Sequence, residues 1–175
     1  MDDIEVRELQ PQDEAGVARL FASCEDYFVA ATGAPALPAD VQSLYYALPE
    51  GADLDQKRLL VLCRGEEVVG LADLVDRHPD AESLSVGLFL VAPKARRTGL
   101  GTAVARRLTE EAAGRGTRTV TATCPSDWEP GLGFLHALGF ELGPPREMTG
   151  DTLGNRTRHP AETGLHTARL SLADR

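Results

Sequence analysis

A basic turn with two glycines, placed between an apolar strand and a helix, is the part of this sequence best suited to chemistry. Residues 88–91 are apolar, and residues 94–102 then carry one lysine, two arginines and two glycines. Glycine lets backbone amides approach a ligand closely, and the first turn of a helix has unpaired N–H groups and a partial positive charge. We therefore expect this turn to bind a phosphate group.

Two common nucleotide-binding motifs do not match the turn. A dinucleotide-binding fingerprint needs a third glycine three residues after Gly101, and the chain has Val104 there. A Walker loop needs Gly-Lys-Ser or Gly-Lys-Thr, and neither triplet occurs in the 175 residues. The spacing Arg96-x-x-Gly99-x-Gly101 instead resembles the coenzyme A pyrophosphate loop of GNAT-type N-acetyltransferases.

Hydrophobic periodicity predicts an α/β chain around this turn. The sequence Arg64-Gly65-Glu66 lies between two strand patterns and indicates a β-hairpin. Residues 143–163 are rich in Gly, Pro, Thr and Arg, and we expect an irregular loop there. The predicted strands are residues 4–9, 58–63, 67–74, 83–91, 117–123 and 164–172, with one more that starts at 139; the predicted helices are 13–24, 38–48, 99–114 and 132–138.

This order of elements resembles the GNAT arrangement over nearly the whole chain. The sequence Leu138-Gly139-Phe140 also resembles the family's Leu-Gly-Phe signature, at the usual distance from the pyrophosphate loop. The resemblance implies one α+β domain, residues 1–175, with a mixed and mostly antiparallel sheet. It also implies a splayed pair of strands and about four flanking helices.

The resemblance further implies an activity. A GNAT enzyme transfers an acetyl group from acetyl-CoA to a primary amine by direct attack in a ternary complex, and it needs no metal. One splayed strand pairs its backbone with the pantetheine arm, and an N–H group there polarises the thioester carbonyl; the alternative for the side chains of this strand is plain core packing. By this resemblance the cofactor-binding residues are Phe89, Leu90, Val91, Arg96, Arg97, Thr98, Gly99, Leu100, Gly101 and Thr102.

Three residues depart from the family pattern. The position at which many members carry a tyrosine general acid is Leu135, which has no proton to donate. The asparagine that contacts pantetheine falls at Trp128, and a glutamate that serves some members as a base falls at Ser85. None of these three roles transfers to this chain.

The remaining candidates for chemistry are carboxylates and tyrosines. Asp73 lies in an otherwise apolar strand, so its carboxylate either faces solvent or lies in a cleft, where it could act as a base through water. Glu25, Asp26 and Tyr27 form a second cluster, which either recognises a cationic acceptor or is only a polar helix end. We predict Asp73 and Tyr27 as catalytic residues, and Glu25, Asp26, Tyr27 and Tyr45 as substrate-binding residues.

Charge is distributed unevenly along the chain. Residues 1–90 contain 18 acidic and 6 basic side chains, whereas residues 91–175 contain 9 acidic and 12 basic ones. The basic half suits an anionic cofactor, and the acidic half suits a small cationic amine unless it is only a solvated surface. The net charge of −9 argues against nucleic acid as a partner.

The cysteines and the lack of long apolar runs give information about the cellular compartment of the protein. Cys24, Cys63 and Cys124 are widely spaced and include no Cys-x-x-Cys pair, which predicts reduced thiols and no zinc site. No apolar run approaches the ~20 residues of a membrane span, and the acidic start is unlike a signal peptide. We expect a cytoplasmic protein that does not contact a membrane, and the resemblance would allow a homodimer.

Three alternatives to a small-amine acetyltransferase stay open. GNAT members also acetylate lysines and peptide or protein N-termini, and a 143–163 loop folded over the cleft would exclude a polypeptide. The missing tyrosine and glutamate also fit a non-catalytic protein that binds acyl-CoA. A structural dimerisation module would leave the turn at residues 96–101 without a ligand.

Overall fold

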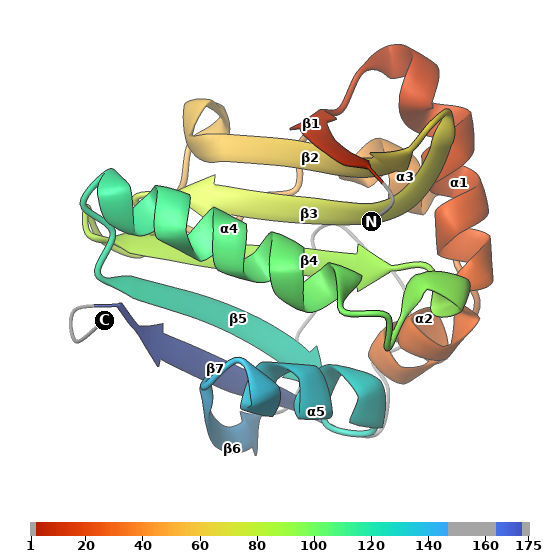
Figure 1. The fold of residues 1–175 in the computed structure, drawn as a ribbon. Helices are drawn as coiled ribbons and strands as arrows, with labels where there is room; N and C mark the ends of the chain where they lie inside the picture. Colours follow the sequence, from red (N-terminus) through yellow and green to blue (C-terminus); the bar gives the residue numbers. More distant parts are fainter. Residues whose placement is uncertain (1–2, 147–163, 173–175) are drawn as a thin grey trace.

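A seven-stranded sheet forms the centre of the computed structural model, which describes residues 3–146 and 164–172 (Figure 1). The strands are β1 (Ile4–Glu8), β2 (Lys57–Arg64), β3 (Glu67–Asp76), β4 (Ser83–Val91), β5 (Thr119–Pro125), β6 (Glu141–Arg146) and β7 (Leu165–Ser171). Their order in the sheet is β1-β2-β3-β4-β5-β7-β6. Only β4 and β5 pair in parallel among these described strands, so the prediction of a mixed, mostly antiparallel sheet is confirmed.

Helices cover both faces of the sheet. They are α1 (Glu14–Ser23), α2 (Glu25–Thr32), α3 (Pro38–Ser43), α4 (Leu100–Gly114) and α5 (Glu129–Ala137). Helices α4 and α5 lie across the face that is in front in Figure 1. Apolar residues of α1, α2 and α3 form a second core with the opposite face. No helix in the described ranges is long and apolar enough to cross a membrane.

Strand β3 separates these two cores. Val69 and Ala72 join the core beneath α4 and α5, while Val68 and Leu71 join the core of α1, α2 and α3. Since successive side chains of a strand point to opposite faces, a strand buried on both faces is apolar almost throughout. Asp73 interrupts this apolar run, and the alternation places it on the same face as Leu71.

The observed helices differ from the predicted ones in two places. The first predicted helix, residues 13–24, corresponds to α1, and a separate helix, α2, follows it directly after Cys24 leaves the helical conformation with φ −95° and ψ 38°. The second, α3, ends at Ser43 and does not reach Leu48. Its end is early because the next three amides bond to carbonyls three residues back, in the manner of 3₁₀ turns.

The predicted 143–163 loop begins as a strand, which corrects the sequence-based expectation. Strand β6 continues through Pro144 and Pro145 and pairs with β7, with an irregular register between Leu142 and Pro145. Proline is tolerated there because β6 is the last strand of the sheet and its ladder is irregular. Residues 147–163 of the predicted loop lie outside the described residues.

Strands β4 and β5 separate halfway along their length. They pair only where residues 83–86 meet residues 119–122. The register of β4 against β3 shifts at Gly87, which is an extra residue in β4, and such a bulge bends a strand. The two strands then diverge towards their C-terminal ends, where α2 lies (Figure 1). We call this unpaired region the β4–β5 split; it is the predicted splayed pair.

Gly70 of β3 lets its backbone lie close to Leu90 of β4 and Leu62 of β2, which leads to a prediction. A Cβ at Gly70 would lie 2.8 Å from the backbone oxygen of Leu90 and 2.9 Å from Leu62 Cδ2. We predict that Gly70→Ala lowers the free energy of unfolding by about 1–3 kcal/mol in urea denaturation, because a strand must shift. Gly114→Ala is the control, because a Cβ there meets nothing within 4 Å; it should be neutral or stabilise by up to about 1 kcal/mol. Equal effects of the two substitutions would contradict the prediction.

Candidate functional site

Two cavities lie on opposite faces of the sheet and meet at the β4–β5 split. The first has a volume of about 320 Å³ and lies between the split and helices α4 and α5; we call it the α5 cavity. The second has a volume of about 370 Å³ and lies between the split, α3 and the loop after α3; we call it the α3 cavity. Both are lined by Tyr27, Val86, Gly87, Leu88, Ala122 and Thr123. Molecules in the two cavities can therefore approach each other through the split.

The basic turn before α4 has the geometry of an anion site. Gly99 is the N-cap residue of α4, and its φ of 89° is a conformation that favours glycine. A Cβ at Gly99 would meet no atom within 4 Å, so the space beside the turn is open. Ala103 N donates to Gly99 O at 3.0 Å. The amides before Ala103 belong to the first turn of the helix, where N–H groups lack helical acceptors and suit a phosphate.

The end of β4 directs backbone groups into the split. Ala92 N donates to Val69 O of β3 at 2.8 Å, so alternation points the N–H and C=O groups of Phe89 and Val91 away from β3. One of these groups is already bonded, because the Val91 carbonyl accepts a hydrogen bond from Arg96 Nε at 2.9 Å. The others are placed to pair with an extended ligand, as strand backbones do.

The side chains beside this backbone belong to the protein core. Leu90 is fully buried, and Leu100 is buried beneath α4. The Phe89 ring stacks on Phe134 with the ring centroids 5.6 Å apart. A Cβ at Gly101 would lie 3.3 Å from the Phe134 ring, so the first turn of α4 packs directly on it. Phe89 and Phe134 line the α5 cavity, whereas Leu90 and Leu100 are core residues, and the backbone is left to meet a ligand.

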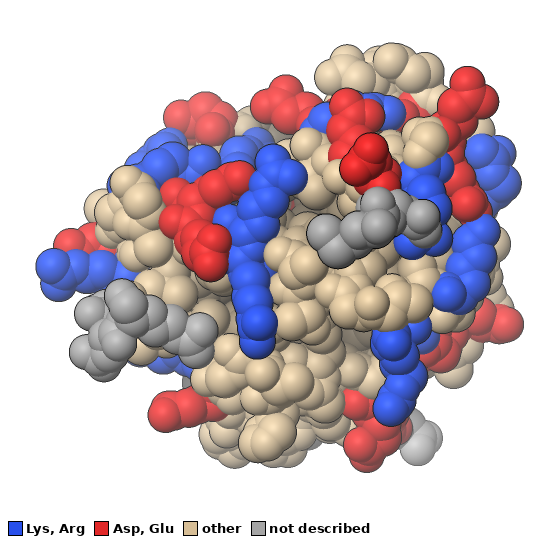
Figure 2. Space-filling view, viewed as in Figure 1, with Lys and Arg blue, Asp and Glu red and all other residues tan. Residues whose placement is uncertain are grey.

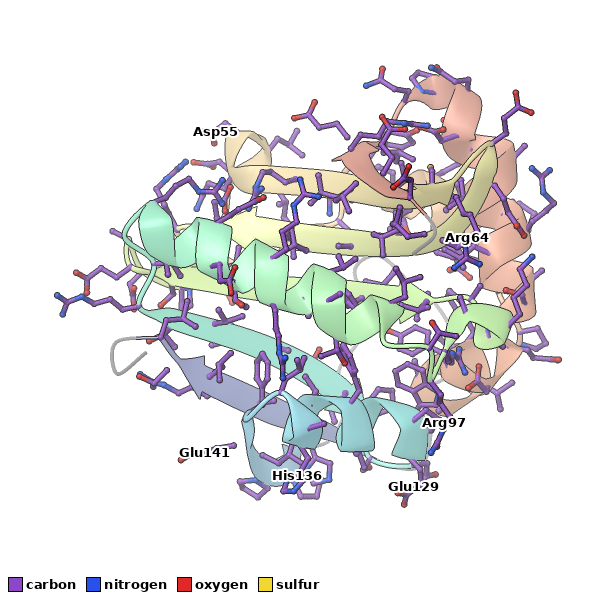
Figure 3. The ribbon with its side chains drawn as sticks, in the orientation of Figure 1. Asp55, Arg64, Arg97, Glu129, His136 and Glu141 are labelled. Atoms are coloured by element: carbon purple, nitrogen blue, oxygen red, sulfur yellow. The ribbon has the colours of Figure 1, made fainter. Side chains whose placement is uncertain are left out.

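The two arginines of the turn have different surroundings. Arg96 is half-buried and pairs with Asp26 through both terminal nitrogens, at 2.7 and 3.2 Å. Arg97 is exposed and pairs with none of the described residues. Figure 3 shows it at the end of the molecule where α4 and α5 begin. Thr98 Oγ1 donates to Ala95 O at 2.6 Å and shapes the turn, and Thr102 lies half-buried in the first turn of α4. Arg97 is therefore the arginine available to a bound anion.

Asp73 lies at the α3 cavity in a buried ion pair. Lys57 Nζ donates to both Asp73 oxygens at 3.0 Å and to the Ala47 carbonyl at 2.6 Å. The side chains of Lys57 and Asp73 are 4% and 13% exposed. Burial raises the pKa of Asp73 above its ordinary value, while the charge and hydrogen bonds of Lys57 oppose the rise. The carboxylate borders the split, because a Cβ at Gly87 would lie 3.5 Å from Asp73 Oδ2.

The four predicted acceptor residues do not gather in one place. Tyr27 is buried and lines both cavities. The Asp26 carboxylate accepts two hydrogen bonds from Arg96 of the basic turn. Glu25 is exposed, and Tyr45 donates to Glu14 Oε1 at 2.8 Å; neither Glu25 nor Tyr45 lines the α3 cavity. Of the four, Tyr27 alone lines the cavity in which we would expect an acceptor.

Several residues singled out in the sequence lie around the α5 cavity. Leu135 is buried there, and Trp128 is half-buried at the start of α5. A histidine of α5 that also borders this cavity, His136, is exposed and points away from the sheet (Figure 3). Cys124 is buried, which raises the pKa of its thiol to about 12, so it is protonated near neutral pH and a poor nucleophile. All three cysteines are free and buried.

Ion pairs neutralise several carboxylates of the acidic half. The pairs include Arg7 with Asp13, Lys57 with Asp73, Arg58 with Asp76 and Arg96 with Asp26. On the face with α4 and α5, side chains of both signs are interspersed (Figure 2). At the α3 cavity, Glu50 is an exposed carboxylate among the lining residues. The acidic N-terminal half therefore exerts a weaker pull on a cation than its formal charge suggests.

Two residues of this site, Gly87 and Lys57, were not predicted from the sequence. Gly87 is an isolated glycine within a strand pattern, which is a known sign of a bulge and could have been used. Lys57 begins a strand, where a lysine is ordinarily exposed. Nothing near Lys57 in the sequence pairs it with Asp73, because the register of neighbouring strands cannot be read from composition.

Comparison with known proteins agrees with this architecture. The family model described as the acetyltransferase (GNAT) family matches residues 19–140. A structure described as a GNAT-family acetyltransferase from Desulfovibrio desulfuricans is 17% identical, with a TM-score of 0.71 over 98% of this chain and 100% of that one. The Escherichia coli ribosomal-protein-S18-alanine N-acetyltransferase is 17% identical, with a TM-score of 0.65 over 97% and 94%. An aminoglycoside acetyltransferase solved with coenzyme A is 18% identical, with a TM-score of 0.66 over 97% and 95%.

The fold and the site define an α+β protein with a split sheet and a basic turn suited to an anion. The chain belongs to the GNAT acetyltransferase family, because the family model covers more than half of it. A search of curated proteins found no significant match.

The Lys57–Asp73 pair leads to a prediction about stability. Removing one partner of a buried pair leaves an uncompensated charge, whereas replacing both with apolar residues can be nearly neutral. We predict that Asp73→Leu lowers the free energy of unfolding by about 3 kcal/mol, and that Lys57→Met with Asp73→Leu recovers most of this loss. Urea denaturation measures both. If the double variant is less stable than Asp73→Leu alone, the pair is not coupled in this way.

Proposed function

We propose that this protein transfers the acetyl group of acetyl-CoA to the primary amine of a small acceptor by direct attack in a ternary complex. The observation that carries the proposal is the meeting of two cavities, from opposite faces of the sheet, at a split beside the basic turn before α4. Such a site suits two substrates that enter from opposite sides, because holding reactants in contact supplies much of the rate.

The α5 cavity and the turn have the groups that acetyl-CoA requires. The first amides of α4 and the Arg97 guanidinium would hold its pyrophosphate. Backbone groups of Phe89 and Val91 in the split would pair with its pantetheine arm. Bound acetyl-CoA would supply an activated thioester. An N–H group of β4 would then stabilise the negative charge that develops on the carbonyl oxygen.

Asp73 and Tyr27 are our candidates for proton transfer. The acceptor amine has to lose a proton, and Asp73 at the α3 cavity could take it directly or through water. Lys57 orients the Asp73 carboxylate by bonding to both of its oxygens. Tyr27 lines both cavities and could protonate the departing thiolate or orient the acceptor.

The α3 cavity supports a small acceptor. A volume of about 370 Å³ lies in the range of small-molecule sites. Glu50 is an exposed carboxylate at its lining that could meet a positive charge on the acceptor. A peptide N-terminus is the second candidate class, because the similar structures include both an aminoglycoside acetyltransferase and an acetyltransferase named for an alanine of a ribosomal protein. A parallel screen of small amines and of short peptides would discriminate these classes.

Binding of acetyl-CoA can be tested by thermal stability. A ligand at ~100 times its dissociation constant adds about 2.7 kcal/mol to the folded state, so we expect a clear rise in Tm. Gly99→Val should abolish the rise, because valine is strained at a φ of 89° and obstructs the turn. Gly114→Ala at the other end of the same helix should keep it. If the wild-type Tm does not change with acetyl-CoA, the proposed function is wrong.

The role of Asp73 predicts a pH dependence. A carboxylate acts as a base only when ionised, and burial raises the pKa of Asp73 above the ordinary 3.8. As the pH is lowered, kcat/KM should therefore begin to fall while the pH is still above 3.8. Lys57→Met removes the charge that lowers the pKa, so the acid limb of the profile should move to higher pH. Asp73→Asn should lose this limb and lower kcat about 10²-fold or more. An unchanged acid limb in Asp73→Asn would remove Asp73 from the mechanism.

A further inference from the structure

Asp26 and Arg96 join two parts of the chain that lie on different sides of the sheet. Asp26 belongs to α2, whose apolar residues form the core with α1 and α3, and Arg96 belongs to the turn before α4. The Arg96 Nη1 and Nη2 atoms lie 2.7 and 3.2 Å from the two Asp26 oxygens. Such a two-point contact fixes orientation as well as distance.

The same guanidinium also holds the end of β4. Arg96 Nε donates to the Val91 carbonyl at 2.9 Å. This carbonyl points into the β4–β5 split, where no strand pairs with it, so Arg96 supplies the bond that a neighbouring strand would otherwise give. All three nitrogens of Arg96 are thus engaged within the protein. The side chain fixes the turn in place, and the exposed Arg97 beside it is left for the anion.

Trp128 attaches to the same carboxylate. Its indole Nε1 donates to Asp26 Oδ2 at 2.8 Å, and Arg96 Cζ lies 5.6 Å from the centre of its ring. The Tyr27 ring meets the Trp128 ring edge-on at 5.1 Å. Trp128 lines the α5 cavity, and Tyr27 lines both cavities. A wall shared by the two cavities therefore rests on the Asp26 carboxylate.

The charge of Asp26 is stabilised by these contacts. Partial burial favours the protonated form, but the hydrogen bonds from Arg96 and Trp128 and the charge of Arg96 outweigh it and hold the pKa of Asp26 below its ordinary value. Asp26 itself does not line the α3 cavity.

We propose that Asp26 is a positioning residue that links the two substrate sites: through Arg96 it fixes the anion-binding turn, and through Trp128 and Tyr27 it fixes the wall of the acceptor cavity. This inference rests on the proposed function for the identity of the two substrates. It replaces the role suggested by the sequence, in which Asp26 binds the acceptor directly. Loss of the carboxylate should weaken both sites together, although it touches neither ligand.

The test compares Asp26→Ala with Asp127→Ala. Asp127 is an exposed carboxylate next to Trp128 in the chain, and it lines neither cavity. Trp128 is the one tryptophan of the sequence, so its fluorescence reports on the wall without any label. In the free protein, Asp26→Ala should shift the emission to longer wavelength, because the indole loses its partner and becomes more exposed to water. Asp127→Ala should not shift it.

Ligand measurements complete the test. Asp26→Ala should raise the Kd for acetyl-CoA about tenfold, measured by titration without an acceptor, and should also raise the KM of whichever amine the screen identifies. Asp26→Asn should have a smaller effect on both, because its amide oxygen can still accept from Trp128. If Asp26→Ala fails to fold, as judged by circular dichroism, the Asn variant carries the comparison with Asp127→Ala.

Two results would overturn the proposal. If Asp26→Ala changes the emission wavelength and the Kd for acetyl-CoA no more than Asp127→Ala does, the network does not position the sites. If only the KM for the amine rises, Asp26 contacts the acceptor directly. The emission shift is measured without ligand, so it tests the network even if the wild-type protein does not bind acetyl-CoA, which would instead contradict the proposed function.

Discussion

One extra residue in β4 determines where two substrates could meet. Neighbouring strands of a sheet normally satisfy each other's backbone groups along their whole length. At Gly87 the register against β3 shifts, and β4 stops pairing with β5. The sheet thereby opens a passage between its two faces while β3 and β7 keep both strands in place. Arg96 satisfies one of the unpaired backbone groups, the Val91 carbonyl. A bound ligand would satisfy the other unpaired groups of β4.

Ion pairs have a structural function on both sides of this passage. Lys57 ties Asp73 to the Ala47 carbonyl in the loop after α3, and Arg96 ties Asp26 to the end of β4. The Lys57–Asp73 pair is buried, and such a pair contributes little net stability, although removal of one partner is strongly destabilising. The Asp26 side chain of the other pair is 42% exposed. The value of both pairs lies in geometry, because each pair connects a helix or loop at a cavity wall to a strand at the split. The acidic bias of the N-terminal half is thus used for internal pairing as well as for any attraction of a substrate.

The sequence predicts the elements of this protein better than their contacts. Strong periodicity located β2, β3, β4 and α4 closely, because each has an apolar pattern bounded by glycine or proline turns. The turn at Gly99 was also predictable, since a glycine with positive φ before a helix is a property of local backbone geometry. The Asp26–Arg96 pair was not, because 70 positions separate the two residues in the chain. Which carboxylate faces a substrate and which one faces an arginine depends on tertiary packing, and a single sequence does not contain that information.

The prolines of β6 have a consequence for assembly. Among the described strands, β6 and β1 form the two edges of the sheet at which a second copy of the chain could pair. Pro144 and Pro145 have no N–H group to offer such a partner, and the irregular register near them disrupts the ladder. Continuous edge-to-edge association through these residues is therefore disfavoured. If a dimer extended the sheet, the edge at β1, whose five residues include no proline, would suit it better than β6.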